Sequence, residues 1–542
     1  MEINDLNAVQ AKQKEAIQLL TGGEVLELLR NKRFLTAWDE LFQSCPWATI
    51  FQGKEYVTTW YSMYHKLFLP ILVKAERGEK LVGLLALGKY CDGSGLIVGA
   101  GAKHAEYQTW LAEPSNGEEF VQSALYEIQK IFPKSDIHLK FLPDKTPLSW
   151  TKSNPIWRKT CVLRRFTQPL LLINEVSITK ELRKKNRREK INRLNKLGKL
   201  KFERITDSLH FSSVINELIT QNDFRKVAMY NIAYFEVDPL KKSFLLALFE
   251  QNLFHATVLK LNNQIIASNI SIADRGWAHL WGLSSHAPSF GKYSPGILHF
   301  LLLGQQLAKE GYKVLDLTPG DDPYKYGLAT EHAEAHELRI SGSLPSYAKD
   351  MAIVLVWRYL GRLGINRKVL KYKLVKKVHR AKERFRVMLE LGPVQLAKSL
   401  LYRPGSAGKQ QATYQLWPAT APPPAQGGIR RDSLDDLLLY RPARAQVSRW
   451  EFLEEAMVRF ETRQHSYTLA EEGRLLLCVW LGAPGAGPEE AAALQDLYCH
   501  PDGAGKLQAF LGAVAGEVAG TQKCRRVTIS ADTASKALSW LL

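Results

Sequence analysis

The chain has 542 residues, of which 46% are hydrophobic and 23% are charged, and its formal net charge is +19. This composition excludes an intrinsically disordered chain, and the length predicts about three or four domains. A generally basic protein is also excluded, because residues 179–204 hold 12 Lys and Arg against 3 Glu, residues 358–388 hold 12 against one, and the remainder is nearly neutral.

The first predicted domain covers residues 1–170. A helical beginning is followed by strand-like apolar runs at 67–76, 80–90, 95–101 and 136–142. Apolar runs of this length, separated by polar and helical segments, are typical of a sheet flanked by helices. The fold class predicted here is α/β (α+β) with mixed sheets.

Residues 171–350 repeat this plan and form the second predicted domain. A basic helix at 179–197 leads to a strand at 199–205, helices within 207–253 and a hairpin within 255–285. Asn262-Asn263 is a favourable hairpin turn, because asparagine tolerates the left-handed conformation that such turns require.

Tyr293-Ser294-Pro295-Gly296 leads into an apolar helix that ends at Gly311. The first backbone N–H groups of a helix have no intrahelical partner and lie at the positive end of its dipole. The Ser-Pro-Gly start therefore suits a phosphate or pyrophosphate, although a capped helix in the protein core would have the same sequence pattern.

The next strand ends in LDLTPGDDPYKYG, residues 315–327. A Pro-Gly turn sets Asp321, Asp322, Tyr324 and Lys325 close together, which fits either a surface turn or a substrate site. The hairpin, the helix and this turn together form the pattern on which the following comparison with a known family depends.

The stretch YSPGILHFLLLGQQLAKEGYKVLDLTPGDDPYKYG, residues 293–327, resembles the GNAT-type acetyltransferases associated with bacterial cellulose and envelope polysaccharide synthesis (the CelD/BcsL type). Upstream segments are also similar: the basic helix at 183–193, the hairpin run at 264–272, and the runs at 51–60 and 81–87. The resemblance spans residues 45–345 and implies two GNAT-like halves in tandem, as in the related Fem-type aminoacyl transferases.

The resemblance implies an acyltransferase that moves an acetyl or short acyl group from acyl-CoA to an amine or hydroxyl of an envelope polysaccharide or its precursor. It assigns catalysis to Asp316, Asp321 and His286, and the donor phosphates to Tyr293, Ser294, Pro295, Gly296 and Ile297. It assigns acceptor binding, for a glycan or a nucleotide-sugar-like molecule, to Tyr324, Lys325, Arg187 and Arg188. The loop departs from the common GNAT pattern because Phe290–Gly296 lacks the second close glycine.

Two alternatives stay open. A Fem-type enzyme would take its donor from aminoacyl-tRNA, bound through the basic helix at 179–197. A membrane-docked assembly factor would use inert GNAT folds as binding platforms.

Beyond residue 350 we expect a basic helical segment (351–410), a linker rich in Ala and Pro (411–448) and a degenerate GNAT-like domain (449–542). Lysines surround an apolar side of residues 365–388, which suits an anionic membrane surface. The loop HPDGAGKL (500–507) resembles a phosphate-binding loop only loosely, because His500 stands at its first position.

The first residues are acidic and polar, and the longest apolar runs are shorter than a membrane span. The six cysteines include no Cys-x-x-Cys pair, so we expect no metal and no disulfide framework. These features predict a cytoplasmic protein, with a peripheral position on the inner face of the membrane left open.

Overall fold

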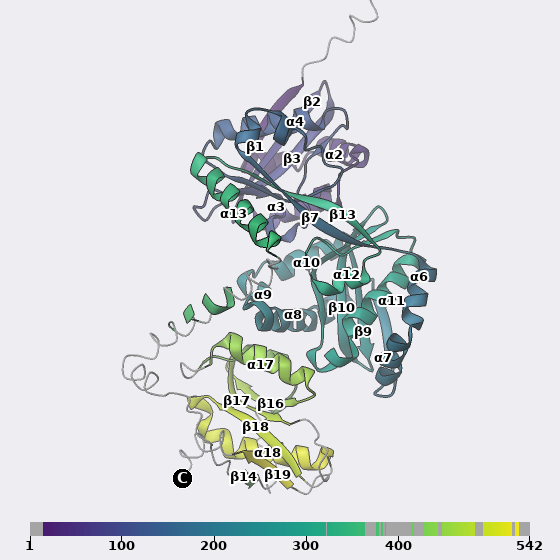
Figure 1. Ribbon diagram of the computed structural model, residues 1–542, viewed down its shortest axis with the longest axis vertical. Coiled ribbons are helices and arrows are strands. Elements are labelled where there is room, and N and C mark those ends of the chain that lie inside the picture. Colours follow the sequence, from purple (N-terminus) through teal and green to yellow (C-terminus); the bar gives the residue numbers. More distant parts are fainter. Residues whose placement is uncertain are drawn as a thin grey trace, which may run out of the picture.

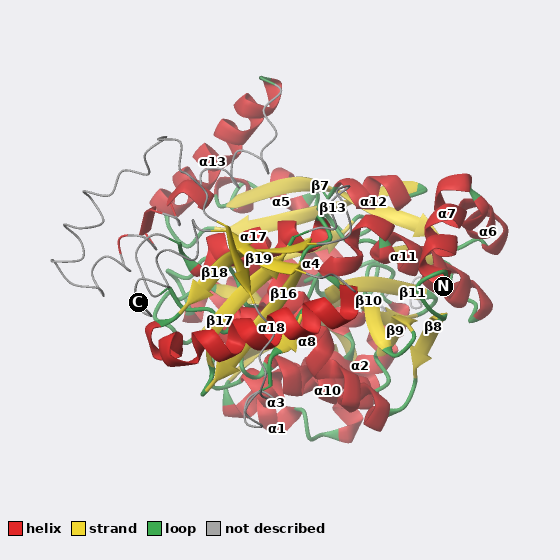
Figure 2. Ribbon diagram, turned by 90° about the horizontal axis from the view of Figure 1, so that it is seen from below, coloured by secondary structure: helices red, strands yellow, loops and turns green. Residues whose placement is uncertain are grey.

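The computed structural model describes residues 15–320 and 322–363 and, further along the chain, 375–378, 381–382, 385, 413–416, 428–442, 447–482, 491–522 and 526–530. Figure 1 shows the first half of the chain at the top, the second half in the middle and a separate C-terminal domain, in yellow, at the bottom. Helices lie on both sides of the strands, as the view from below shows (Figure 2).

The first half builds its sheet from strands that alternate with helices. Its strands are β1 (Ala16–Thr21), β2 (Phe68–Arg77), β3 (Lys80–Tyr90), β4 (Ile97–Gly99), β5 (Leu111–Ala112) and β6 (Ile137–Pro143). Its helices are α1 (Gly23–Leu28), α2 (Lys32–Ser44), η1 (Ile50–Gln52), α3 (Lys54–Tyr64), η2 (Ala102–His104), α4 (Gly117–Ile131), α5 (Trp150–Ser153) and η3 (Trp157–Lys159).

The second half follows the same plan. Its strands are β8 (Leu200–Ile205), β9 (Phe254–Leu261), β10 (Gln264–Asp274), β11 (Trp277–His286) and β12 (Val314–Asp316). Its helices are α6 (Glu175–Arg183), α7 (Lys185–Asn195), α8 (Ser208–Tyr230), α9 (Tyr234–Val237), α10 (Lys241–Glu250), η4 (Pro288–Tyr293), α11 (Pro295–Lys309), α12 (Pro323–Leu328) and α13 (Leu344–Arg362). The single basic helix expected at 179–197 is two helices, because Lys184 has an extended ψ of 140° between α6 and α7.

Two long strands join the halves into one sheet. They are β7 (Cys161–Leu172) and β13 (Glu331–Ile340), and they pair with each other over ten residues. β13 also pairs with β6 of the first half, and β7 also pairs with β12 of the second half. Each half therefore receives an edge strand from the other, and the strand order is β1-β2-β3-β4-β6-β13-β7-β12-β11-β10-β9-β8.

The C-terminal domain has its own sheet, in the order β14-β19-β18-β17-β16-β15. These strands are β14 (Thr413–Leu416), β15 (Arg430–Arg431), β16 (His465–Glu471), β17 (Arg474–Leu481), β18 (Ala491–Cys499) and β19 (Arg526–Ser530). Its helices are α16 (Leu434–Leu438), α17 (Arg449–Glu461), η5 (Pro501–Lys506) and α18 (Leu507–Gln522).

One connectivity occurs in both halves of the shared sheet and in the C-terminal domain. Three antiparallel strands are followed by a helix and then by a strand parallel to the third: β2-β3-β4-α4-β6, β9-β10-β11-α11-β12 and β16-β17-β18-α18-β19. The predicted class of mixed sheets flanked by helices is therefore confirmed. In the part of the chain that the structure describes, no helix is both long and apolar enough to cross a membrane.

Candidate active site

The second half contains a fork between β11 and β12. β11 pairs with β10 along its length, but it pairs with the parallel strand β12 only at Trp277, Ala278 and His279. Beyond this point the two strands separate, so the backbone groups of residues 280–286 that face β12 have no strand partner there. Separated strands that lead into a helix start leave room for a ligand between them.

A cavity of about 420 Å³ lies at the end of this fork, and we call it the α11 cavity. Five of the residues expected from the sequence line it together: His286, Ser294, Gly296, Ile297 and Tyr324. The opposite wall comes from α8, through residues that include Arg225 and Lys226. The structure thus brings together the predicted donor loop, the predicted histidine and one predicted acceptor residue.

Several polar atoms in the cavity wall are buried without a partner in the described structure. They are the hydroxyls of Ser268 and Ser285 and the Nε2 atom of His299, on side chains that are all at least nine-tenths buried. An unsatisfied buried polar group costs about 1–3 kcal/mol, so native proteins rarely leave one without a reason. These side chains give the cavity wall a polar character.

The start of α11 is open to a ligand as well. Pro295 has no N–H, and Ser294 makes no side-chain cap to the helix. The Ser294 hydroxyl instead accepts a hydrogen bond from Lys190 Nζ of α7, at 2.7 Å. Lys190 therefore adds a positive charge to the helix dipole at this end of the cavity.

His286 and Arg225 differ in charge although they share the cavity. Burial, with Arg225 as the second cause, lowers the pKa of His286 to about 3, so this imidazole is neutral at physiological pH. Burial also lowers the pKa of Arg225, although an arginine keeps its charge. Arg225 makes no hydrogen bond or ion pair with any residue that the structure describes.

Asp316 lies elsewhere, at the junction of the two halves. It is fully buried, and its Oδ2 accepts from the Tyr107 hydroxyl at 2.6 Å and lies 2.8 Å from His279 Nδ1. Its Oδ1 accepts from the Thr318 backbone N–H at 2.7 Å. These contacts hold Asp316 between elements of both halves, outside the lining of the α11 cavity, and its catalytic role stays a prediction.

The predicted acceptor residues separate in space. Tyr324 lines the cavity and stacks on Phe300 with ring centroids 5.8 Å apart, whereas Lys325 is buried and donates from Nζ to the Thr318 carbonyl at 3.0 Å. Asp321 lies outside the described residues.

Tyr293 and the two predicted arginines also lie outside the α11 cavity. Tyr293 lines a different cavity, between α8 and the C-terminal domain. Arg188 is exposed, and Arg187 is half-buried with its Nε unpaired. Lys190, one turn further along α7, is the basic residue that reaches the donor loop.

The sequence reasoning missed Lys190 and Arg225. Lys190 lies in the predicted basic helix, three residues after Arg187. Residues at this spacing share a helix face, so Lys190 could have been predicted together with Arg187. No sequence pattern marks Arg225, because α8 has the pattern of an ordinary long helix. Only the tertiary fold places Arg225 near the end of β11.

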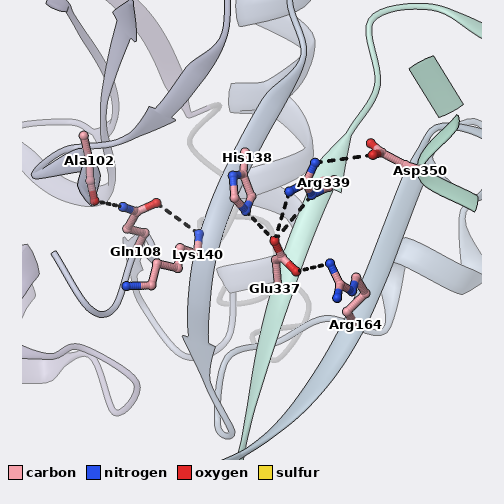
Figure 3. A network of polar contacts seen from close by, with 8 residues as sticks. All are labelled: Ala102, Gln108, His138, Lys140, Arg164, Glu337, Arg339 and Asp350. Atoms are coloured by element: carbon pink, nitrogen blue, oxygen red, sulfur yellow. Dashed lines mark hydrogen bonds and ion pairs between the residues drawn. The ribbon is translucent and has the colours of Figure 1, made fainter. Parts of the chain in front are cut away.

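In the first half, the equivalent gap between β4 and β6 is filled. Gln108 donates from Nε2 to the Ala102 carbonyl at 2.6 Å and accepts at Oε1 from the Lys140 N–H at 3.0 Å, as Figure 3 shows. A Cβ at Gly99 would lie 2.6 Å from the Gln108 Cβ, so only glycine allows this approach. The cavity that remains beside Gly99 and Gln108 has a volume of only about 10 Å³, which is about the space of one water molecule.

In the C-terminal domain, β18 pairs with β19 only through residues 491–494, so a gap follows here too. Charged residues of its helix-start loop are already paired, Lys506 with Glu471 and Asp502 with Arg474 of β17. The described residues of the whole chain contain no group of three or more His, Cys, Asp or Glu suited to a metal ion.

Residues 181–326 match the family model of the acetyltransferase (GNAT) domain, and the α11 cavity lies within this match. No curated protein matches the chain. Solved structures of similar fold include FemX (10% identity, 58% of this chain and 97% of that one, TM-score 0.40) and L-PGS from Bacillus licheniformis (11%, 60% and 96%, TM-score 0.38). A tandem GNAT protein from the clavulanic acid biosynthesis pathway is also similar (9% identity, 61% and 99%, TM-score 0.37). Within the second half, residues 181–326 are therefore similar to a GNAT acetyltransferase domain.

Proposed function

We propose that this protein transfers an acetyl or other short acyl group from acyl-CoA to an amine or hydroxyl of a cell-envelope polysaccharide or its precursor. The match of residues 181–326 to the GNAT domain supports acyl transfer. The resemblance of residues 293–327 to envelope-associated acetyltransferases supports the choice of acceptor.

The observation that carries the proposal is the uncapped start of α11, which faces a cavity with unpaired buried polar atoms. The donor's phosphates would take the place of a cap at Gly296, next to Lys190.

In the proposed reaction the acceptor's nitrogen or oxygen attacks the thioester carbonyl directly, and the thiolate of the donor leaves. The backbone N–H groups that β11 exposes beyond its pairing with β12 would stabilise the oxyanion. His286 is neutral and could accept a hydrogen bond from the nucleophile, but with a pKa of about 3 it is a weak base. We therefore assign it to orientation of the nucleophile, and the proton leaves to solvent.

The test is a calorimetric titration of the full-length protein with acetyl-CoA, together with the variants Gly296→Asp and Gly296→Asn. We expect saturable binding by the wild type and by Gly296→Asn, and at least a tenfold loss in Gly296→Asp, because a carboxylate there repels the donor phosphates. A Cβ at Gly296 would lie 3.5 Å from His286 Nδ1, an ordinary contact, and an acidic residue in the first turn favours the helix.

Equal binding by both variants would place the donor phosphates elsewhere. If the folded wild type does not bind acetyl-CoA at all, the proposal fails. Salt-dependent binding of aminoacyl-tRNA would then support the Fem-type alternative, and its absence would support an assembly factor.

A further inference from the structure

Lys241, the first residue of α10, is a buried cation. The residue is 7% exposed, and its Nζ lies 4.9 Å from the ring centroid of Tyr234 and 4.6 Å from that of Phe235. It makes no hydrogen bond or ion pair with any residue in the described part of the chain. Because a buried charge without a counter-ion is costly, the site is incomplete without an anion.

The two nearest carboxylates are engaged elsewhere. Asp223 accepts hydrogen bonds from the backbone N–H groups of Tyr234 and Phe235, and Asp238 contacts His104 at 2.8 Å and Lys103 at 3.2 Å. Burial lowers the pKa of Lys241 to about 8, although Asp223 and Asp238 act in the opposite direction. Aromatic rings thus surround the Lys241 ammonium, and no carboxylate of the described residues pairs with it directly.

The ammonium lies over the fork of the active site. A Cβ at Gly282 would lie 3.8 Å from Lys241 Nζ. Ser284, Ser285 and His286 follow Gly282 on β11, and all three line the α11 cavity. Lys241 Nζ therefore lies over β11 two residues before the lining of the cavity begins.

Further features of α8 connect the two places. The Asn222 amide donates to the Gly282 carbonyl at 3.2 Å, and its Oδ1 is buried without a partner in the described structure. Lys226 lines the α11 cavity and lies 6.0 Å from the Tyr234 ring that Lys241 also contacts. With Arg225, these lysines make the α8 side of the fork positive, opposite the donor loop on α11.

We propose that the acyl acceptor carries an anionic group, a phosphate or a carboxylate, which Lys241 binds over Gly282 while Arg225 adds to the attraction. The inference rests on the proposed function, because it concerns the acceptor of the same site. In this proposal the anionic group of the substrate is the ion-pair partner of Lys241, and this lysine determines acceptor specificity.

The test compares amino sugars that differ only in their anionic group: glucosamine, glucosamine 1-phosphate, glucosamine 6-phosphate and muramic acid. Binding to the full-length protein is measured by calorimetry, with and without saturating coenzyme A. We expect at least one anionic sugar to bind about 10- to 100-fold more tightly than glucosamine, which is the range of a charge-assisted contact. Phosphate and carboxylate are distinguished by which sugar binds.

Lys241→Met should abolish this preference, and Lys241→Arg should retain part of it. Methionine suits the aromatic surroundings of position 241, so the variant should fold. The control is Lys242→Met, because Lys242 is a half-buried neighbour that donates to Asn216 instead. A preference that survives in Lys241→Met, tighter binding of glucosamine, or no binding of any anionic sugar would overturn the proposal. Loss of coenzyme A binding alone would count against the proposed function and not against the role of Lys241.

A second observation concerns α13, in which no residue is buried. Leu355, Tyr359 and Leu363 follow one another at helical spacing, with Val356 beside them, and all four are more than half exposed. The first turn is fixed to the first half, because the Ser346 hydroxyl bonds Asp136 at 2.6 Å. The apolar stripe thus has a defined position, and its four residues are exposed in the described part of the chain.

The charges at this end of α13 favour one partner. Arg358 and Arg362 belong to the helix itself, and residues 358–388 hold 12 Lys and Arg against one Glu. An apolar stripe bordered by cations matches the boundary of an anionic lipid bilayer. We infer that α13 lies on an anionic membrane surface, where it would keep the enzyme close to envelope precursors.

The inference is tested by co-sedimentation of the full-length protein with vesicles of phosphatidylcholine alone or with phosphatidylglycerol added. We expect salt-sensitive binding to the anionic vesicles and at least a tenfold weaker partition for the double variant Leu355→Ser, Tyr359→Ser. The control is Leu209→Ser, which removes an isolated leucine of α8 that is 83% exposed. Equal binding to both vesicle types, or an unaffected double variant, would overturn the inference.

Discussion

At the scale of single residues, Asp316 has a structural role beside the catalytic one that the sequence predicts. From the sequence it is a carboxylate at a strand end before a functional turn. In the structure it accepts hydrogen bonds that tie β12 to Tyr107 of the first half and to Thr318 of the turn. Burial, followed by Asp316, raises the pKa of Tyr107, which keeps this hydroxyl protonated and able to donate.

We expect Asp316→Asn to lower the free energy of unfolding by about 2–4 kcal/mol, because an amide nitrogen would replace one of two buried acceptor oxygens. Denaturant unfolding measures this loss, and Asp92→Asn, in an exposed loop, is the control. Unchanged stability together with lost transfer activity would instead favour a catalytic role for Asp316.

At the scale of elements, the sequence correctly predicted the helices and strands that are determined by local residue patterns. The hairpin strands β9–β11 and the start of α11 were read correctly, because turn residues and apolar periodicity specify them. His286, Ser294, Gly296 and Ile297 were found together because they are close in sequence around one strand end and one helix start. The break at Lys184 was missed, since nothing in the charge pattern of 179–197 marks it.

Residues supplied by distant elements could not be predicted in this way. Arg225 comes from α8 and Lys241 from α10, and both reach β11 only because helices pack over the sheet. Gln108 has no motif at all, yet it decides that the gap of the first half is filled while the equivalent gap of the second half is open. These differences depend on tertiary contacts and not on element boundaries.

At the scale of the whole molecule, three units of one connectivity are joined in two ways. The first and second halves share a sheet through β7 and β13. The C-terminal domain has its own sheet but shares a hydrophobic core with α8, in which Phe224 packs near Phe460, and Trp450 donates to the Ala228 carbonyl at 2.9 Å. It therefore supports the helix that carries Arg225.

Calorimetric unfolding should show two transitions, one for the joint sheet and one for the C-terminal domain. Deleting residues 411–542 should remove one transition and shift the other to lower temperature, because Phe224 and Val227 lose their cover. Trp450→Phe, which removes the hydrogen bond to Ala228 together with part of the buried ring, should shift the transitions with both still present. If the truncated chain shows no cooperative transition, the C-terminal domain is part of the folding unit of the other two.

The exchange of β7 and β13 also sets an order for folding during synthesis. β6 has its second neighbour only when β13 has been made, so the first half leaves the ribosome with an unpaired strand edge that persists until residue 340 emerges. Exposed edges favour association with other chains. A gene cut between the halves would therefore yield two fragments that each lack a strand held by the other.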